Sequence, residues 1–390
     1  MVAGTPVASV ERRVRRVGLN CLYLVPRHVG GTEIYARELI AALALERPQV
    51  EWVVFAGVEA ASVLPDPSWP ANVRVRRVPV KAAVKPLRLA AELAALPVLG
   101  RQERLDLLHS LGTTTPLHGA VPRVVTVHDL IYHHYPGTFP SAARHGLELL
   151  VPRGARRAAR VQVSSHATKE EVVRLLRLDP GRVDVVPLGL GMRTAADPTP
   201  AERLRVAHGL GDAPIVLSVA AALPHKNLDR LIRAMRSVPD ALLVLVGHAG
   251  RDTPRLRTLA ETLGVGPRVR FTGWVSDEDL EGLYRAAAAF VYPSLHEGFG
   301  LPVLEAMRRG LPVACADATS LPEVAGPAAL LFDPTSEADI TRATELLLEG
   351  GPDVEERVRL GRSRALEFGW DRTARAALAS YTEALTGGPR

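Results

Sequence analysis

The chain has 390 residues, of which 47% are hydrophobic and 23% charged, and its formal net charge is +6. A chain of this length is typical of two domains, and the apolar fraction suffices for a complete core in each, which excludes an intrinsically disordered protein. No run approaches the roughly 18 consecutive apolar residues of a membrane helix. The two cysteines, Cys21 and Cys315, lie in apolar runs that predict buried thiols rather than a disulfide framework.

The positive charge is concentrated in the first half of the chain. Residues 1–190 contain 25 Lys and Arg against 16 Asp and Glu, a balance of +9, and the remainder carries −3. A basic half can face anionic lipid or an anionic acceptor. An Arg-rich surface set by genomic composition would give the same balance. Nucleic acid is not expected as a partner, because the basic stretches lack interleaved aromatic residues.

The first elements resemble a signal peptide but predict a strand and a helix. The apolar run Val17–Val25 follows several arginines, yet no small-residue cleavage site comes after it, so it predicts a buried strand. The next loop contains Gly30 and Gly31, and Thr32 is placed to cap a helix over 33–45. These glycines do not form a GxGxxG fingerprint, but they can bring amides near a pyrophosphate; a plain tight turn is the alternative.

Strand-like and helix-like segments then alternate up to residue 190. Strands are expected over 52–56, 73–78, 105–110, 123–127, 160–164 and 183–186, and helices over 81–99, 142–159 and 166–177, the last capped by Ser165. The apolar and basic helical stretch over 81–99 is expected to be broken by Pro86 and Pro97, and it suits either a membrane surface or domain packing. His128 and Asp129 follow the strand over 123–127, at the carboxyl edge where open α/β sheets bind ligands. Both are therefore candidate site residues.

The second half repeats the strand and helix pattern after a Pro-, Ala- and Thr-rich linker over 192–201. Strands are expected over 215–219, 241–246, 269–272, 290–292 and 312–316, and Ser276 or Asp277 is expected to cap a helix over 278–286. Lys226 lies between the first of these strands and a helix, where a cation can neutralise a diphosphate leaving group.

A glycine-bearing loop and a short helix follow the strand over 290–292. Pro302 suits the first helical position and Gly310 the position that ends the helix. Gly298 and Gly300 let the backbone come close to a ligand, and the amides at the helix start favour an anion.

Two carboxylates frame this predicted anion position. Glu297 lies in the loop and Glu305 lies in the helix, with seven residues between them. Both would repel a phosphate, so we expect them to bond neutral hydroxyls on either side of it, as on a ribose and a sugar. Taken singly, each glutamate is better explained as a solvated surface residue.

The string HEGFGLPVLEAM, which holds both glutamates, resembles the signature of family 4 of the retaining glycosyltransferases, a large bacterial family with the GT-B fold. The resemblance covers nearly the whole chain, through the segments GGTEIYARELIAAL, VVTVHDLIYHHYP, VQVSSHATKEEV, PLGLG and FGWDRTARAALASYTEAL. It implies two Rossmann-like, doubly wound α/β domains facing each other across a cleft. We expect an acceptor-binding domain over 1–192, a donor-binding domain over 193–370, and a helix over 371–390 that crosses back to the first domain.

The resemblance also assigns roles to residues. Glu297 would hold a sugar hydroxyl near the reacting carbon, His128 the other side of the sugar, and Lys226 the leaving diphosphate. The remaining donor-binding positions would be Glu305 at the ribose, Phe299, Gly300, Leu301, Gly30, Gly31, His225 and Asp129, with Val275 in the loop whose backbone reads the base. The family carries an Arg a few residues before the Lys, and Ala221 stands there instead. His225 or Arg27 is a candidate for the missing cation.

The implied activity is a retaining transfer of a hexose from a nucleotide-diphosphate sugar to a hydroxyl of a saccharide, lipid-linked or metabolite acceptor. Mannose from GDP-mannose is favoured over UDP-glucose-type donors. We expect no metal and no other cofactor, because no Asp-x-Asp site has a strand context. The expected location is the cytoplasm, with peripheral contact to the inner face of the membrane left open.

Two alternatives stay open from the sequence. One is a catalytically silent subunit that holds a nucleotide-sugar for a partner; the presence of Glu297, Glu305 and Lys226 argues against it, and the missing Arg leaves room for it. The other is a GT-B epimerase or phosphorylase, for which the chain shows no second pair of acids.

Overall fold

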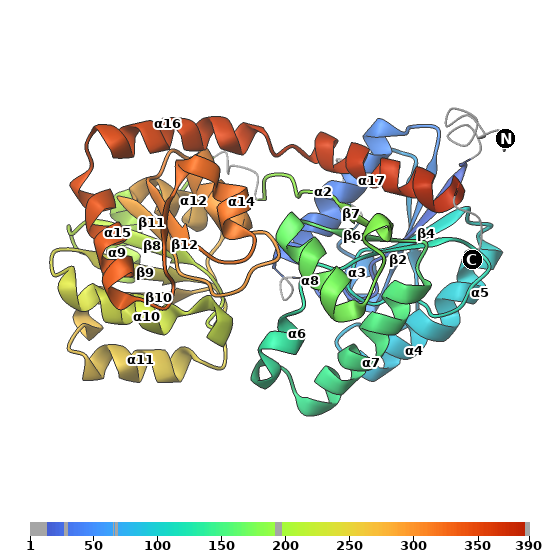
Figure 1. Cartoon of the computed structure of the whole chain (residues 1–390), viewed down its shortest axis with the longest axis horizontal. Helices are drawn as coiled ribbons and strands as arrows, with labels where there is room; N and C mark the ends of the chain where they lie inside the picture. The colour runs from blue at the N-terminus through green and yellow to red at the C-terminus, as the bar shows by residue number, and fades with distance from the viewer. Residues whose placement is uncertain (1–13, 27–29, 65, 67–68, 192–196, 387–390) are drawn as a thin grey trace. The chain divides into compact units, whose positions relative to one another are not determined.

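The computed structural model describes residues 14–26, 30–64, 66, 69–191 and 197–386 (Figure 1). The chain divides into two compact units: unit 1 contains Met1–Gly189 and Phe368–Arg390, and unit 2 contains Leu190–Glu367. The expected boundary after residue 192, and half of the expected linker, lie outside the described residues. Residues 368–386 pack with unit 1.

Unit 1 is built on a parallel sheet. Its strands run in the order β3-β2-β1-β4-β5-β6-β7. They are β1 (Arg16–Asn20), β2 (Glu51–Ala56), β3 (Val73–Arg77), β4 (Leu107–Ser110), β5 (Arg123–Thr126), β6 (Arg160–Val163) and β7 (Val183–Val185). The inner strands are almost wholly buried, because helices cover both faces of a parallel sheet, and this explains their near-continuous apolar runs.

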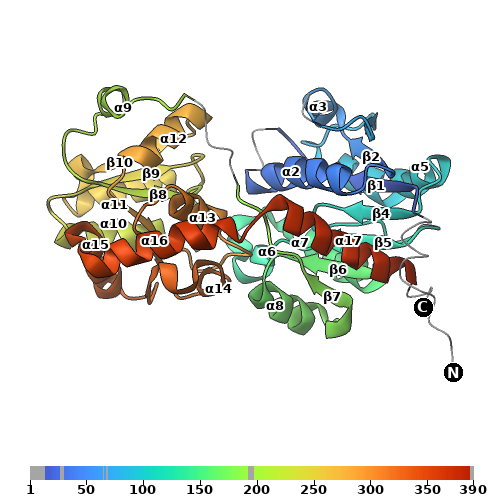
Figure 2. The ribbon, with the colours of Figure 1, turned by 90° about the horizontal axis from the view of Figure 1, so that it is seen from above.

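The helices of unit 1 connect these strands. They are α2 (Gly31–Glu46), α3 (Val58–Ala61), α4 (Lys85–Ala90), the π-helical turn η1 (Ala91–Ala95), α5 (Leu96–Gln102), α6 (Ile131–His134), η2 (Pro136–Thr138), α7 (Ser141–Arg157), α8 (His166–Leu176), η3 (Pro180–Arg182) and α17 (Trp370–Thr386). The last of them, α17, packs along α2 and against β6 (Figure 2).

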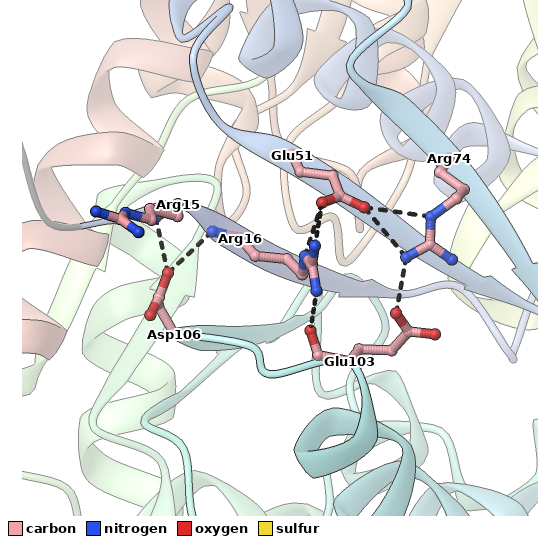
Figure 3. A network of polar contacts seen from close by, with 6 residues as sticks. All are labelled: Arg15, Arg16, Glu51, Arg74, Glu103 and Asp106. Atoms are coloured by element: carbon pink, nitrogen blue, oxygen red, sulfur yellow. Dashed lines mark hydrogen bonds and ion pairs between the residues drawn. The ribbon is translucent and has the colours of Figure 1, made fainter.

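A network of charged side chains ties together the amino ends of the strands of unit 1 (Figure 3). The Arg16 guanidinium donates to Glu51 Oε2 at 2.7 Å and to the Glu103 carbonyl at 2.6 Å. Arg74 donates to Glu51 Oε1 at 3.1 Å and to Glu103 Oε2 at 2.7 Å. Arg16 and Arg74, which contribute to the positive charge of the first half, therefore stabilise the fold. They lie at the edge of the sheet opposite to the carboxyl ends of the strands.

Unit 2 contains a second parallel sheet, with the strand order β10-β9-β8-β11-β12-β13. Its strands are β8 (Ile215–Val219), β9 (Leu242–Val246), β10 (Val269–Gly273), β11 (Ala289–Tyr292), β12 (Val313–Ala316) and β13 (Leu330–Phe332). The order reverses direction at β8, whose neighbours are β9 and β11, and this switch point is where such sheets bind ligands.

Helices lie on both faces of this sheet, with α12 and α16 on one side and α10 and α11 on the other (Figure 1). They are α9 (Ala201–His208), η4 (Pro224–Lys226), α10 (Leu228–Ala234), η5 (Met235–Ser237), α11 (Thr253–Thr262), η6 (Gly266–Arg268), α12 (Asp277–Ala286), α13 (Leu301–Arg308), α14 (Leu321–Ala325), η7 (Gly326–Ala328), α15 (Glu337–Glu349) and α16 (Pro352–Leu366).

Several local expectations are confirmed. The Ser165 hydroxyl accepts the amide of Thr168 at the start of α8, and the Ser276 hydroxyl accepts the amide of Asp279 at the start of α12. Cys21 and Cys315 are buried free thiols. Within the described part of the chain, no helix is both long enough and apolar enough to cross a membrane.

Three expectations are wrong in detail. Thr32 does not cap α2; Gly30 occupies the cap position with φ of 52°, a backbone conformation that glycine adopts without steric cost. The first strand ends at Asn20 rather than Val25, because the chain turns there. Pro97 does not break the helix expected over 81–99, since a π-helical turn lets α4 run into α5, where Pro97 falls in the first turn.

Candidate active site

The loops that follow β8 and β11 are joined at the carboxyl edge of the unit 2 sheet. The two strands are parallel neighbours, so their carboxyl ends lie side by side. The His225 carbonyl accepts the amide of Leu295 at 2.8 Å and the hydroxyl of Ser294 at 3.1 Å. Asn227 donates its side-chain amide to the Pro293 carbonyl at 3.0 Å. These bonds fix the two loops against each other.

This junction brings together Lys226 and Glu297, which are 71 residues apart in sequence. Lys226 Nζ donates to Glu297 Oε1 at 2.5 Å, and the Tyr292 hydroxyl donates to the same oxygen at 2.9 Å. Lys226 Nζ also lies 3.2 Å from the Tyr292 hydroxyl. The Lys226 and Glu297 side chains are 15% and 11% exposed, so the pair is mostly but not completely shielded from solvent.

The charge state of Glu297 follows from two opposing effects. Burial of the carboxyl acts to raise its pKa, and the charge and hydrogen bond of Lys226 more than offset that burial. The pKa of Glu297 therefore lies below its ordinary value, and the side chain is ionised at neutral pH. An ionised carboxylate can accept hydrogen bonds from hydroxyls but cannot act as a general acid.

The start of α13 is held next to Glu297. Gly300 occupies the cap position with φ of 113°, which favours glycine, and a Cβ there would lie 2.6 Å from Leu321 Cδ2. The Ser320 hydroxyl lies 3.0 Å from the Glu297 carbonyl and 2.7 Å from the Phe299 carbonyl. The helix begins at Leu301, one residue before the predicted position.

Glu305 lies inside α13 and is 6% exposed. Its Oε2 accepts a hydrogen bond from the Tyr284 hydroxyl at 3.0 Å. A side chain at residue 191 would meet Glu305 Oε1 at 2.1 Å, so the carboxylate lies directly against the Gly191 backbone.

A buried ion pair between Arg309 and Glu281 packs against Tyr284 and Glu305. Arg309 lies over the Tyr284 ring, 4.5 Å from its centroid, and donates to the Glu305 carbonyl at 3.0 Å. Arg309 Nη2 also lies 2.6 Å from Glu281 Oε2, and both side chains are almost fully buried. A buried charge needs such a partner to remain tolerable.

The environment of His225 disfavours the charged form of its imidazole. Its side chain is buried, and burial together with the charge of Lys226 lowers its pKa to about 4. The imidazole is therefore neutral at pH 7. Arg27, the other candidate for this role, lies outside the described residues. Val275 follows β10 at the same edge of the sheet and is buried.

In unit 1, His128 lies just after β5 with a defined ring orientation. Its Nε2 lies 2.8 Å from the Leu111 carbonyl, which requires the proton on Nε2 and leaves Nδ1 as an acceptor when the ring is neutral. The ring packs edge-on against Tyr35, with centroids 4.8 Å apart. Burial lowers the pKa of His128, against the opposing effects of the Leu111 carbonyl and Asp129.

A chain of buried hydrogen bonds runs from Tyr35 to the C-terminal helix. The Tyr35 hydroxyl lies 2.8 Å from Thr126 Oγ1, which lies 2.8 Å from His109 Nε2. His109 Nδ1 in turn lies 2.6 Å from the Tyr381 hydroxyl on α17. Burial lowers the pKa of His109 to about 3, so this chain is neutral at physiological pH.

The other candidate residues of unit 1 shape the starts of two helices. Gly30 and Gly31 form the turn into α2, and nothing lies within 4 Å of a Cβ placed on Gly30, so its positive φ alone favours glycine. Asp129 Oδ1 accepts the Ile131 amide at 3.0 Å, at the start of α6.

Sequence reasoning found the charged residues of the unit 2 site but missed those that hold them. Lys226, Glu297 and the start of α13 share one edge of the sheet. Tyr284 and Tyr292 were not identified, although Tyr292 ends a strand five residues before Glu297. A buried tyrosine hydroxyl needs a partner, and that requirement was the available signal.

Comparisons with known proteins match both halves of the chain. Residues 29–191 match the sequence model of "Glycosyltransferase Family 4", and residues 201–364 match that of "Glycosyl transferases group 1". The chain is 31% identical to O-antigen chain mannosyltransferase B of Escherichia coli over 66% of its length and 69% of that protein. It is 30% identical to D-inositol 3-phosphate glycosyltransferase of Streptomyces bingchenggensis over 97% of its length and 91% of that protein.

Solved structures share the fold of this chain at lower sequence identity. The sucrose-phosphate synthase of Thermosynechococcus elongatus matches with a TM-score of 0.74 at 22% identity, over 96% of this chain and all of that one. Anabaena HepE, solved with UDP and glucose, matches with a TM-score of 0.71 at 19% identity, over 94% of this chain and 99% of that one. At these identities the likeness shows the fold.

Proposed function

Because this chain belongs to the group 1 glycosyltransferases and has their GT-B fold of two Rossmann-like domains, we propose that it transfers a hexose from a nucleotide-diphosphate sugar with retention of configuration. Mannose is the favoured sugar, and GDP-mannose the favoured donor. The support for mannose is the 31% identity to an O-antigen mannosyltransferase, and the support for retention is the resemblance to family 4.

The observation that carries the proposal is the Lys226–Glu297 pair beside the start of α13. Departure of a nucleoside diphosphate needs positive charge at the leaving oxygens, and a lysine beside helix amides provides it. We assign the diphosphate to Lys226 and the amides of Phe299, Gly300 and Leu301. In this assignment Glu297 stays ionised and accepts a sugar hydroxyl.

The remaining roles follow the same chemistry. Glu305 would accept the ribose hydroxyls, and Val275 would meet the base through its backbone. His128 would contact the sugar, with Nδ1 available as an acceptor. Gly30 and Gly31 would bring amides to the phosphates. The reaction breaks the bond between the sugar C1 and the diphosphate oxygen and forms one from C1 to the acceptor oxygen; the hydroxyl proton goes to the departing phosphate.

The proposal includes no metal. Lys226 and the helix amides would take the place of a divalent cation at the diphosphate. We assign no cationic role to His225, because burial and the charge of Lys226 lower its pKa to about 4.

The experiment that tests this function is a titration followed by a transfer assay. GDP and UDP are titrated calorimetrically into the protein without added metal, and again with chelator. GDP-mannose and UDP-glucose are then incubated with mannose oligosaccharides, and nucleotide release and product anomeric configuration are measured. We expect GDP to bind at least tenfold more tightly than UDP, and an axial-to-axial transfer from GDP-mannose. Binding without turnover would favour the silent subunit, and no binding would refute the proposal.

The acceptor is proposed to be a saccharide, a lipid-linked saccharide or a polar metabolite, with the protein meeting an anionic membrane through unit 1. The support for membrane contact is the helix from α4 to α5, where Leu87 and Val98 are 58% and 56% exposed beside Lys85 and Arg101. Flotation with anionic vesicles tests it. Leu87→Asp should reduce binding, and Leu366→Asp, at the exposed end of α16, should not.

A further inference from the structure

Three aromatic rings form a buried column beneath the two glutamates of unit 2. Tyr284, on α12, stacks on Phe290 of β11 with centroids 5.9 Å apart and an interplanar angle of 30°. Phe290 stacks on Tyr292 of the same strand, again at 5.9 Å and with an angle of 17°. All three side chains are 2% exposed or less.

The two outer rings of this column each donate a hydroxyl to a different glutamate. The Tyr292 hydroxyl donates to Glu297 Oε1 at 2.9 Å, and the Tyr284 hydroxyl donates to Glu305 Oε2 at 3.0 Å. Burial raises the pKa of both tyrosines well above the ordinary range, so both hydroxyls keep their protons and act as donors. The middle ring has no hydroxyl and contributes only to the packing.

The geometry points to a positioning role: we propose that Tyr292 and Tyr284 each orient one glutamate, Tyr292 for the sugar-binding Glu297 and Tyr284 for the nucleotide-binding Glu305. This inference rests on the proposed function, because it takes over the separate roles assigned there to the two glutamates. Neither tyrosine contacts the donor in this scheme; each acts through the carboxylate it holds.

A cation lies near each of the two tyrosine rings. The Arg309 guanidinium lies 4.5 Å from the Tyr284 ring centroid and is itself fixed by the buried carboxylate of Glu281. Lys226 Nζ lies 5.6 Å from the Tyr292 centroid. A fully buried ring that stacks on Phe290 has little freedom, so its hydroxyl presents a fixed hydrogen bond.

The hydroxyls matter because the carboxylates are shielded from water. A buried carboxylate oxygen that loses its donor keeps its desolvation cost and turns toward other partners. For Glu297, Lys226 would then be the remaining strong donor on Oε1, which draws the carboxylate toward the lysine and away from a sugar hydroxyl. For Glu305, loss of the Tyr284 donor would loosen the side chain that faces the ribose.

Two conservative variants separate these effects. Tyr292→Phe keeps the stack and should lower kcat about tenfold, with the dissociation constant of the nucleoside diphosphate within twofold of wild type. Tyr284→Phe should raise that dissociation constant about tenfold and leave kcat at saturating donor within twofold or threefold. Tyr381→Phe removes a buried hydroxyl from unit 1 and is the matched control. This control should lower the unfolding midpoint without changing kcat or the dissociation constant selectively.

Double-mutant cycles make the test specific. Tyr292→Phe should be strongly non-additive with Glu297→Gln and additive with Glu305→Gln, and Tyr284→Phe should show the reverse pattern. Parallel losses of kcat and binding that follow thermal stability would overturn the proposal, and so would wild-type behaviour of both variants. If the two glutamine variants are themselves fully active, the proposed function fails; if they are impaired as assigned, failure of the tyrosine variants refutes this inference alone.

Discussion

Replacing Glu297 by glutamine should tighten nucleotide binding while it greatly slows transfer. Lys226 Nζ is held by Glu297 Oε1 at 2.5 Å, and in the proposed function the same ammonium meets the diphosphate. The carboxylate and the diphosphate therefore compete for one cation. Glutamine keeps the shape and still accepts from the Tyr292 hydroxyl, but it removes the charge that competes.

The size of the effect follows from the exposure of the pair. Exposed ion pairs contribute about 0.2–1 kcal/mol, and fully buried ones are far more sensitive to loss of one partner. With 15% and 11% exposure, the Lys226–Glu297 pair lies between these limits. Release of about 1 kcal/mol toward the diphosphate corresponds to roughly fivefold tighter binding.

The assay is calorimetric titration of GDP at low ionic strength into wild type and Glu297→Gln, with transfer measured on the same samples. Glu349→Gln removes one charge from the end of α15 and serves as the control for net charge. Its dissociation constant should not change. Binding weakened more than fivefold in Glu297→Gln would show that Glu297 supports the nucleotide instead of competing with it. An unchanged constant would mean that Lys226 does not meet the diphosphate.

Three further outcomes are expected. Glu305→Ala should weaken GDP binding at least tenfold in titration, and an unchanged dissociation constant would remove its ribose role. Glu281→Gln should lower the free energy of unfolding by about 3 kcal/mol in urea titrations, because Arg309 keeps its charge in a buried position without its partner; a change below 1 kcal/mol would contradict this. The buried His109 has its pKa lowered to about 3, so between pH 6.5 and 3 the unfolded chain binds a proton that the folded chain does not. The free energy of unfolding should not be reduced by His109 above pH 6.5, and below that pH it should fall by up to about 1.4 kcal/mol per pH unit. In urea titrations, the free energy of unfolding of His109→Gln should depend less steeply on pH.

The sequence determined the local elements and indicated the family. The strand over 215–219 appears with the predicted bounds as β8, because a run of buried apolar residues has few alternatives in a parallel sheet. Ser165 and Ser276 cap their helices as expected, since a cap depends only on residues within one turn. The spacing of Glu297 and Glu305 was likewise visible in one short segment.

Tertiary structure decided which of these residues meet and in what state. The pairing of Lys226 with Glu297 depends on β8 and β11 being neighbours, which no local pattern specifies. The neutral state of His225 depends on burial and on the charge beside it. The donors to the two glutamates, Tyr292 and Tyr284, come from a stack whose members belong to different elements. Short-range pattern follows from backbone geometry and periodicity, whereas contact, protonation and orientation arise only when distant segments share one buried environment.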